Sequence, residues 1–213
     1  MDEIDLAHMR RSYERAELHE ASVLSDPFAQ TARWLKDARE SGLPEPNAMC
    51  LATAGAGQPS ARMVLLRGLD ARGLVFYTGY GSRKGTELQS NPLAAALFYW
   101  APLERQIRVE GRVEQVPEQE SDAYFASRPR DHQLGAWASE QSEPVESRDL
   151  LEQRMRDYGE RFEGEAVARP HSWGGFLIRP HRFEFWQGRP SRMHDRLEFN
   201  LESGRWNVGR LQP

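Results

Sequence analysis

The sequence predicts a mainly β protein, an antiparallel β-barrel with helices outside it. Many short runs rich in strand-forming residues follow one another along the chain, and turn-forming residues separate them. Only a few helical patterns accompany these runs. A barrel suits this pattern because closure removes the sheet edges that would otherwise pair with other chains.

Length and composition favour one domain with a terminal arm. The chain has 213 residues, of which 39% are hydrophobic and 28% are charged, as in globular proteins. Residues 1–25 carry charge without clear periodicity and are expected to form an arm that orders on something else. Residues 26–213 are expected to form a single domain, because no repeat or linker divides them.

The helices are recognised by their ends. Asp26 is a favoured N-cap residue, Pro27 suits the first helical position and Gly42 suits the position after the last turn. Ser82 caps a second, short helix. The helices are expected over residues 27–41, 82–91, 117–128 and 147–162, with an irregular polar stretch over 129–146.

The strands are recognised by their β-branched and aromatic residues and by alternation. Residues 106–116 alternate strictly between small or apolar residues and charged ones. The tripeptide 202–204, Glu-Ser-Gly, suits a hairpin turn. Strands are expected over residues 48–53, 60–69, 73–78, 93–100, 106–116, 174–179, 181–187, 192–201 and 205–211.

Charge and composition argue against several classes of function. The net charge of −4 provides no general attraction for nucleic acid or a membrane surface. The longest nearly apolar run is too short to span a bilayer, and the charged first twenty residues do not resemble a secretory signal, so a cytoplasmic protein is expected. The six histidines show no ligand spacing and the single cysteine stands alone, so no metal site is expected.

Two short basic segments are candidates for binding phosphate. Residues 82–85, Ser-Arg-Lys-Gly, open a predicted helix, where free N–H groups already favour an anion. Residues 127–132, Ser-Arg-Pro-Arg-Asp-His, follow another helix. Arg62 and Arg67 flank Met-Val-Leu-Leu in a predicted strand, where simple alternation places them on opposite faces, so a bulge or twist would be needed for both to face one ligand. For each segment, a merely solvated charged surface stays open as the alternative.

The segment from residue 183 to 196 concentrates chemistry-bearing side chains. Arg192, His194 and Arg196 follow each other at every second position, so on one strand all three would share a face. Three such groups on one face would repel each other unless an anionic ligand or carboxylates met them. Either an anionic ligand or neighbouring carboxylates are therefore expected to meet these three side chains.

Taken in order, these motifs resemble the pyridoxine/pyridoxamine 5′-phosphate oxidase family, flavoproteins with an FMN-binding, antiparallel split β-barrel. The resemblance extends over the chain. It rests on RMVLLR (62–67), VFYT (75–78), GSRKG (81–85), LERQ (103–106), YFASRPRD (124–131), GAWASEQS (135–142), FEFWQG (183–188), RMHDR (192–196) and the terminal RLQP.

The resemblance implies a homodimer with FMN in clefts between the subunits. It implies oxidation of pyridoxamine and pyridoxine 5′-phosphates to pyridoxal 5′-phosphate by O2, with hydrogen peroxide as product. The flavin residues implied are Arg62, Met63, Val64, Leu65, Leu66, Arg67, Tyr77, Thr78, Arg83, Lys84, Gln106, Gln141, Ser142, Trp186 and Arg196. The substrate residues implied are Arg10, Tyr13, Arg67, Tyr124, Arg128, His132, Arg192 and His194, of which Arg192 and His194 are the catalytic candidates.

Two departures and two rival functions remain at this point. Arg67 stands where many members have Lys, and His132 stands where a Ser often contacts the substrate phosphate. A related flavin oxidase of phenazine biosynthesis shares the fold, but the second basic segment fits a phosphorylated pyridine better. A non-catalytic flavin- or heme-binding barrel is the other rival, against which Arg192 and His194 argue.

The resemblance to the oxidase family also implies that the arm of residues 1–25 could form a lid over the substrate.

Overall fold

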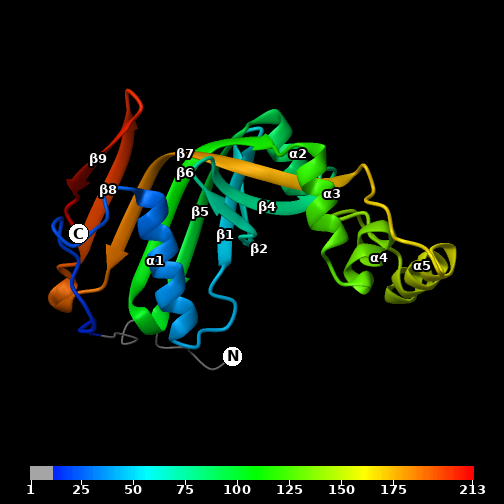
Figure 1. Cartoon of the computed structure of the whole chain (residues 1–213), viewed down its shortest axis with the longest axis horizontal. Coiled ribbons are helices and arrows are strands. Elements are labelled where there is room, and N and C mark those ends of the chain that lie inside the picture. The colour runs from blue at the N-terminus through cyan, green and yellow to red at the C-terminus, as the bar shows by residue number, and fades with distance from the viewer. Residues whose placement is uncertain (1–11) are drawn as a thin grey trace, which may run out of the picture. The chain divides into compact units, whose positions relative to one another are not determined.

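The computed structural model describes residues 12–213, and Figure 1 labels their helices and most of their strands. The described chain forms two units, which are considered in turn. The first unit contains the described residues up to Pro46 together with Leu97–Val109 and His181–Pro213. The second unit contains Asn47–Ala96 and Glu110–Pro180.

Antiparallel pairing organises the strands of the second unit, in the order β2-β1-β5-β6-β7-β4-β3. Ala48 of β1 lies opposite Leu65 of β2, and Leu74 of β4 lies opposite Ile178 of β7. The bounds are β1 Ala48–Gly55, β2 Gln58–Leu65, β3 Gly68–Asp70, β4 Gly73–Gly79, β5 Leu93–Trp100, β6 Arg105–Gln115 and β7 Trp173–Gln187. The last three strands continue into the first unit.

The expected closed barrel is corrected to an open sheet. β2 and β3 stand at the two ends of the strand order, and among the described residues no pairing joins them. The mainly antiparallel β class is confirmed, with helices between the strands. The expected hairpin turn at 202–204 is also confirmed, because Ser203 and Gly204 both have positive φ, as a two-residue hairpin of type I′ requires. Ala56 and Gly57 form a second turn of this kind between β1 and β2.

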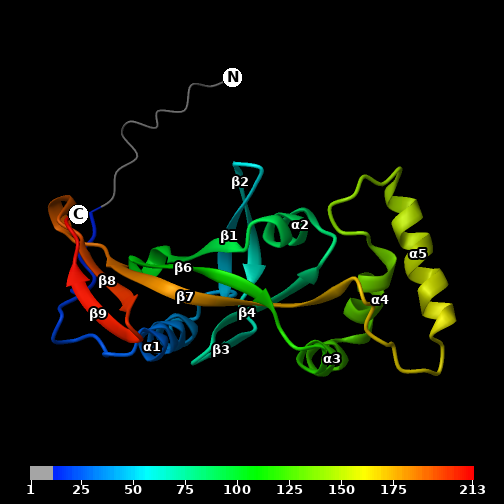
Figure 2. The ribbon, with the colours of Figure 1, turned by 90° about the horizontal axis from the view of Figure 1, so that it is seen from above.

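Four helices belong to the second unit: α2 Arg83–Ser90, α3 Glu118–Ala126, α4 Arg130–Ala138 and α5 Arg148–Arg161. Figure 2 shows α4 and α5 side by side. A buried cluster of Phe125, Leu134, Phe162 and Val167 packs where α3, α4 and the end of α5 meet. The expectation of an irregular stretch over 129–146 is therefore wrong for α4, whose weak apolar pattern becomes helical through packing against this cluster.

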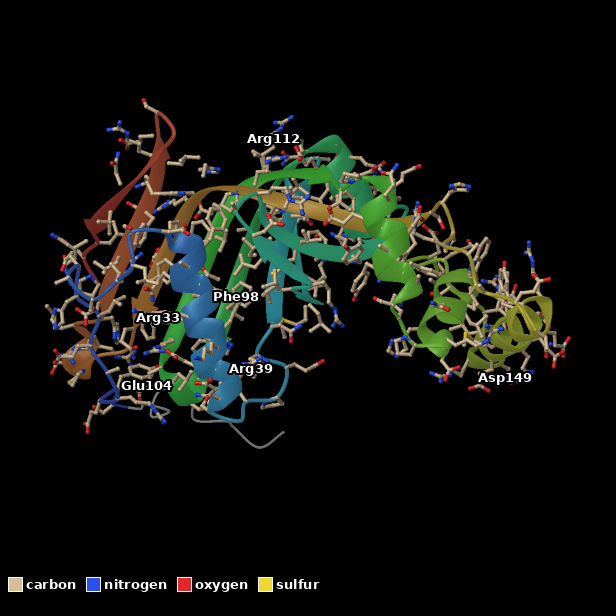
Figure 3. All side chains as sticks on the ribbon, viewed as in Figure 1. Arg33, Arg39, Phe98, Glu104, Arg112 and Asp149 are labelled. Atoms are coloured by element: carbon tan, nitrogen blue, oxygen red, sulfur yellow. The ribbon has the colours of Figure 1, made fainter. Side chains whose placement is uncertain are left out.

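The first unit combines α1 Pro27–Glu40 with β8 Asp195–Glu202, β9 Arg205–Arg210 and the remaining parts of β5, β6 and β7. The Asp26 carboxylate accepts a hydrogen bond from Phe28 N, which confirms the predicted N-cap of α1. Trp34 of α1 packs edge-on against Phe185 of β7, with ring centroids 5.3 Å apart. Both rings are almost fully buried, as is Phe98 of β5, labelled in Figure 3.

Two carboxylates, one buried and one half-buried, hold the segment before α1 in place. Glu104, also labelled in Figure 3, accepts hydrogen bonds from the backbone N–H of Glu14 and of Arg15, at 2.9 and 3.0 Å. Asp195 accepts one from Leu18 N at 3.0 Å. Arg189 forms an ion pair with Glu17 on the same segment. The described part of the expected arm is thus bound to the first unit by its backbone.

Two expected strand boundaries change. The run 60–69 is not one strand: Leu66 N–H donates to Asn47 O and Arg67 N–H donates to Val75 O, so the chain leaves β1 and joins β4 at this point. The expected strands 174–179 and 181–187 are one strand, β7, which contains Pro180. No helix within residues 12–213 is long and apolar enough to cross a membrane.

Candidate functional site

A wide groove of about 1810 Å³ lies in the second unit. β2, β4, the first turn of α2, the α3–α4 corner and the segments 139–143 and 170–173 line it. Fourteen of the residues that the sequence singled out share this lining: Arg62, Met63, Val64, Leu65, Arg67, Tyr77, Thr78, Arg83, Lys84, Tyr124, Arg128, His132, Gln141 and Ser142. Leu66 differs, because its side chain is buried in the core and does not line the groove.

The break between β2 and β3 explains how Arg62 and Arg67 reach one groove. Alternation along an unbroken strand would separate them. At Leu66 the backbone changes its partner from β1 to β4, so Arg62 and Arg67 both line the groove. This break supplies the irregularity that both arginines need in order to face one ligand.

The first turn of α2 presents hydroxyl and ammonium groups to the groove. The Ser82 side chain caps the helix by accepting from Gly85 N. Lys84 is only 7% exposed, and its Nζ donates to Thr78 Oγ1 at 3.1 Å and to Ser82 Oγ at 3.3 Å. Burial, and then the charge of Arg62, holds the pKa of Lys84 below its ordinary value. A buried ammonium held by hydroxyls is well placed to meet an anion.

Close backbone packing fixes this turn. A side chain at Gly85 would place its Cβ 2.2 Å from Tyr80 O, so only glycine fits there. Gln141 joins from the segment after α4, since its Oε1 accepts from Thr78 Oγ1 at 2.7 Å and from Gly79 N at 3.1 Å. Ser142 beside it has a φ of 79°, in the left-handed region. Non-glycine residues hold such a conformation only where their surroundings impose it.

A stack of aromatic rings forms another part of the lining. Tyr77 of β4 and Tyr124 of α3 stack with centroids 3.8 Å apart, and Trp173 lies parallel to Tyr77 at 5.5 Å. The guanidinium of Arg128 lies 4.6 Å from the centroid of the Trp173 ring and 5.4 Å from that of Phe125. Burial raises the pKa of Tyr77 to about 12, so its hydroxyl stays protonated at neutral pH.

Arg128 has a buried donor without an acceptor. Its Nη1 is buried and meets no hydrogen-bond acceptor among residues 12–213. Burial, offset in part by Tyr124, lowers the pKa of Arg128, and the nearby charge of Arg67 lowers it further. Two neighbouring guanidinium groups, one with an unsatisfied buried N–H, fit a site that an anion completes.

The first unit holds the other predicted residues. Tyr13 packs edge-on against Trp186 at 5.6 Å and against His194 at 5.5 Å. The Arg189 N–H donates to His194 Nδ1 at 3.1 Å, so the neutral ring carries its proton on Nε2. Burial, and then Arg192, lowers the pKa of His194. A neutral imidazole that donates through Nε2 is therefore favoured.

The expected strand through Arg192, His194 and Arg196 is corrected. A short 3₁₀ turn spans Pro190–Arg192, and β8 begins only at Asp195. Arg192 is exposed with a φ of 64°, next to Ser191 at 56°, and two consecutive left-handed residues indicate a strained corner. Arg196 instead pairs with the buried Glu184 at 2.8 Å, and Gln106 is half-buried on β6. Arg10 lies outside the described residues.

Sequence reasoning missed three residues of the groove region. Trp173 had no distinguishing signal, since it simply precedes the strand-like Gly-Gly-Phe run. Thr53 and Glu87 lie behind the lining and hydrogen-bond to each other. The spacing of four between Arg83 and Glu87 on one helix could have indicated an ion pair. Among the described residues, no group of three or more His, Cys, Asp or Glu side chains could hold a metal ion.

Comparisons with known proteins agree on one family. Residues 35–162 match the family model described as pyridoxamine 5′-phosphate oxidase, and residues 173–213 match the one described as the pyridoxine 5′-phosphate oxidase C-terminal dimerisation region. A pyridoxine/pyridoxamine 5′-phosphate oxidase of Rubrobacter xylanophilus is 58% identical, over 98% of this chain and 97% of its own. That of Synechocystis sp. is 54% identical over the full length of both chains.

Solved structures support the same fold. PhzG of Burkholderia lata 383, in complex with tetrahydrophenazine-1-carboxylic acid, is 31% identical and superposes with a TM-score of 0.89, covering 95% of this chain and all of its own. A pyridoxamine 5′-phosphate oxidase-related, FMN-binding protein of Nostoc punctiforme superposes with a TM-score of 0.70 at 17% identity, over 93% of this chain and all of its own. The second likeness concerns the fold alone.

Proposed function

The chain belongs to the pyridoxamine 5′-phosphate oxidase family, and we propose that the groove of the second unit holds FMN and a vitamin B6 phosphate together. The protein is an FMN-dependent oxidase that converts pyridoxamine and pyridoxine 5′-phosphates to pyridoxal 5′-phosphate. The observation that carries this proposal is the presence of two separate cationic clusters in one groove. Two phosphorylated ligands need two such clusters.

The donors at the first turn of α2 fit the flavin phosphate. Arg83 and Lys84 open the helix and Arg62 reaches the same region from β2. The amides of a helix N-terminus, a buried ammonium and guanidinium forks are the groups that bind phosphate oxygens best. Thr78 and Gln141 are already linked by a hydrogen bond beside them. These residues would hold the phosphate end of FMN.

The second cluster fits the phosphate of the substrate. Arg67 lies close enough to Arg128 for its charge to lower the pKa of Arg128, and the buried Nη1 of Arg128 lacks an acceptor within residues 12–213. Tyr124 stacks on Tyr77 beside them, and His132 lines the same groove. A substrate phosphate would satisfy Arg128 and relieve the repulsion between the two arginines.

FMN held by these residues would supply the redox chemistry, namely hydride acceptance from the 4′ carbon of the substrate and reoxidation by O2, which gives hydrogen peroxide. We assign Arg192 to stabilise the negative charge that develops during this transfer. His194, neutral and protonated on Nε2, would donate a hydrogen bond that positions the substrate.

The residues of the first unit are proposed to act in a homodimer. The match of residues 173–213 to a dimerisation region supports pairing of two copies. We propose that Gln106, Trp186 and Arg196 reach the flavin in that dimer. Arg10 and Tyr13 of the arm are proposed as a lid, and the packing of Tyr13 on His194 supports this role.

The phenazine-type alternative is less well supported. PhzG is 31% identical to this chain, whereas several relatives named pyridoxine/pyridoxamine 5′-phosphate oxidase are 54–58% identical over nearly the whole chain. The Arg128 cluster also suits a phosphate ester, which a phenazine carboxylic acid lacks.

Anaerobic reduction tests the proposal directly. The FMN-loaded protein is mixed with pyridoxamine 5′-phosphate without oxygen, and the flavin absorption is followed. We expect bleaching that reverses on admission of air, with pyridoxal 5′-phosphate formed. Firmly bound flavin that does not bleach would refute the substrate assignment while leaving the flavin site in place.

A further inference from the structure

A buried carboxylate lies behind the groove, and neither the motifs nor the comparisons assign it a role. Glu87, on the second turn of α2, is only 8% exposed and is not part of the lining. We propose that Glu87 is a positioning residue, which holds Arg62 and Arg83 in the arrangement that binds the flavin phosphate. This inference rests on the proposed function, because it takes FMN as the ligand of these arginines.

Four side chains donate to Glu87. Its Oε2 accepts from Thr53 Oγ1 at 2.5 Å, from Ser60 Oγ at 2.6 Å and from Arg62 Nη2 at 3.2 Å. Its Oε1 accepts from Arg83 Nε at 2.9 Å. These hydrogen bonds, of which those from Ser60 and Thr53 act most strongly, hold the pKa of Glu87 down at about 2. The group is therefore a carboxylate at any physiological pH.

The network fixes Arg62 through a second layer of contacts. Arg62 Nη1 donates to Leu51 O at 3.2 Å and to Thr53 Oγ1 at 2.5 Å. Its Nη2 also donates to Ser60 Oγ, which in turn donates to Glu87. Glu87, Thr53 and Ser60 thus form one hydrogen-bonded frame around this guanidinium. A cation held in this way loses little conformational freedom when a phosphate arrives.

The contact with Glu87 leaves the terminal N–H groups of Arg83 available for phosphate oxygens. Glu87 takes the Nε–H of Arg83, so this ion pair does not use the N–H groups of the two terminal nitrogens. The Arg83 side chain is 61% exposed and lines the groove, whereas its partner is buried. Glu87 therefore anchors the base of a guanidinium whose outer edge can meet phosphate oxygens.

Charge balance supports the same role. Arg62, Arg83 and Lys84 are three like charges near the start of α2, where burial and then the charge of Arg62 lower the pKa of Lys84, and the charge of Glu87 raises it. One carboxylate among three cations leaves two positive charges, which matches the roughly −2 charge of a phosphate monoester near neutral pH. Glu87 thus keeps the cations together before the ligand binds and leaves the charge that the ligand needs.

The competing role is purely structural, since Glu87 also links β1, β2 and α2. A side chain added at Gly55 of β1 would come within 2.9 Å of Glu87 Cγ, so the carboxylate is closely packed. Riboflavin separates the two roles because it has the same ring as FMN without the phosphate. Loss of packing would weaken both flavins alike, whereas loss of phosphate positioning would weaken FMN alone.

The experiment measures the dissociation constants of FMN and riboflavin by flavin fluorescence quenching, on full-length protein freed of flavin by dialysis. In Glu87→Gln, one carboxylate oxygen becomes an NH₂ group that faces a donor. We expect FMN to bind at least about tenfold more weakly, as for loss of a charge-assisted hydrogen bond. Riboflavin affinity is expected to stay within about twofold, because no bond to its phosphate-free chain is changed.

Glu152→Gln is the matched control. Arg148 and Glu152 form the same i, i+4 pair on α5, with Nε and Oε1 3.0 Å apart, and Glu152 does not line the groove. This variant is expected to bind both flavins as the wild type does. Thr53→Val, which keeps the buried shape but removes the hydroxyl between Glu87 and Arg62, provides a second test if Glu87→Gln does not fold. It is expected to weaken FMN binding severalfold and to spare riboflavin.

Each possible result either supports this inference or overturns it. Selective loss of FMN affinity in Glu87→Gln or Thr53→Val supports the inference. Unchanged FMN affinity, or equal loss for FMN and riboflavin, overturns it while the flavin site stands. A wild-type protein that does not prefer FMN over riboflavin would refute the proposed phosphate site itself, and this inference with it.

Discussion

Replacing Arg128 by methionine is expected to weaken the binding of pyridoxamine 5′-phosphate by about 10- to 150-fold. The structure gives this guanidinium a buried Nη1 without an acceptor in the described chain, and places it beside Arg67 in the groove. A hydrogen bond between a charged donor and a phosphate contributes about 1.5–3 kcal/mol, which converts to that range of affinity. Methionine keeps an apolar chain of similar length against Trp173 and Phe125.

The same variant is expected to leave the free energy of unfolding of the unliganded protein within about 1 kcal/mol of the wild-type value. Two opposing terms nearly cancel. An unsatisfied buried donor costs about 1–3 kcal/mol, and removing it stabilises the protein. The guanidinium 4.6 Å over Trp173 contributes about 0.5–2 kcal/mol by cation–π attraction, which is lost. The loss of affinity therefore cannot be ascribed to unfolding.

The assay compares pyridoxamine 5′-phosphate with pyridoxamine, by steady-state KM or by equilibrium binding to the FMN-loaded protein. Arg130→Met is the control, because Arg130 belongs to the same basic segment but donates to Phe162 O and Glu165 O at the end of α5. We expect Arg128→Met to abolish the preference for the phosphorylated ligand and Arg130→Met to retain it. A wild-type KM in Arg128→Met would refute the assignment of the substrate phosphate to this cluster.

Three further predictions concern other parts of the chain. Burial and Arg192 lower the pKa of His194 below its ordinary 6.5, so the unfolded chain binds a proton first as the pH falls, and this histidine reduces stability below about pH 6.5. Arg192→Gln should raise the pKa of His194 in an NMR titration. An unchanged pKa would contradict the coupling between the two side chains. Ala56→Asn should raise the free energy of unfolding in urea by about 0.5 kcal/mol, since Asn before Gly favours the type I′ turn. Glu104→Gln should speed hydrogen exchange at the Glu14 amide, whereas equal protection would show that the carboxylate does not hold this segment.

The sequence predicted the positions of most helices and strands better than it predicted where strands end and which segments they pair with. The caps at Asp26 and Ser82 marked helices that the structure confirms, because a cap is a local interaction. The end of β2 could not be read locally, since it depends on Leu66 and Arg67 finding backbone partners in two distant segments, at Asn47 and at Val75. The helix α4 was missed for a similar reason, because distant residues around Phe125 stabilise it.

The site followed the same division between local and distant interactions. Basic residues near a helix start, such as Arg83 and Lys84, indicate an anion site from the local sequence alone. The partners that tune them come from other strands and loops, as Thr53 and Gln141 show. The alternation argument for Arg192 failed because it assumed a strand where the chain makes a strained turn.

The two phosphate clusters are built in opposite ways, and their proposed ligands explain the difference. Around Arg62 and Arg83, a buried carboxylate and two hydroxyls hold the cations in place in advance, so binding requires little reorganisation and suits a cofactor that stays bound. Arg128 instead keeps an unsatisfied buried N–H between aromatic faces. Its hydrogen bond forms only when a phosphate arrives and breaks when product leaves, so the protein's own side chains do not compete with the substrate for this donor. A groove that turns over one phosphate ester while retaining another needs both designs.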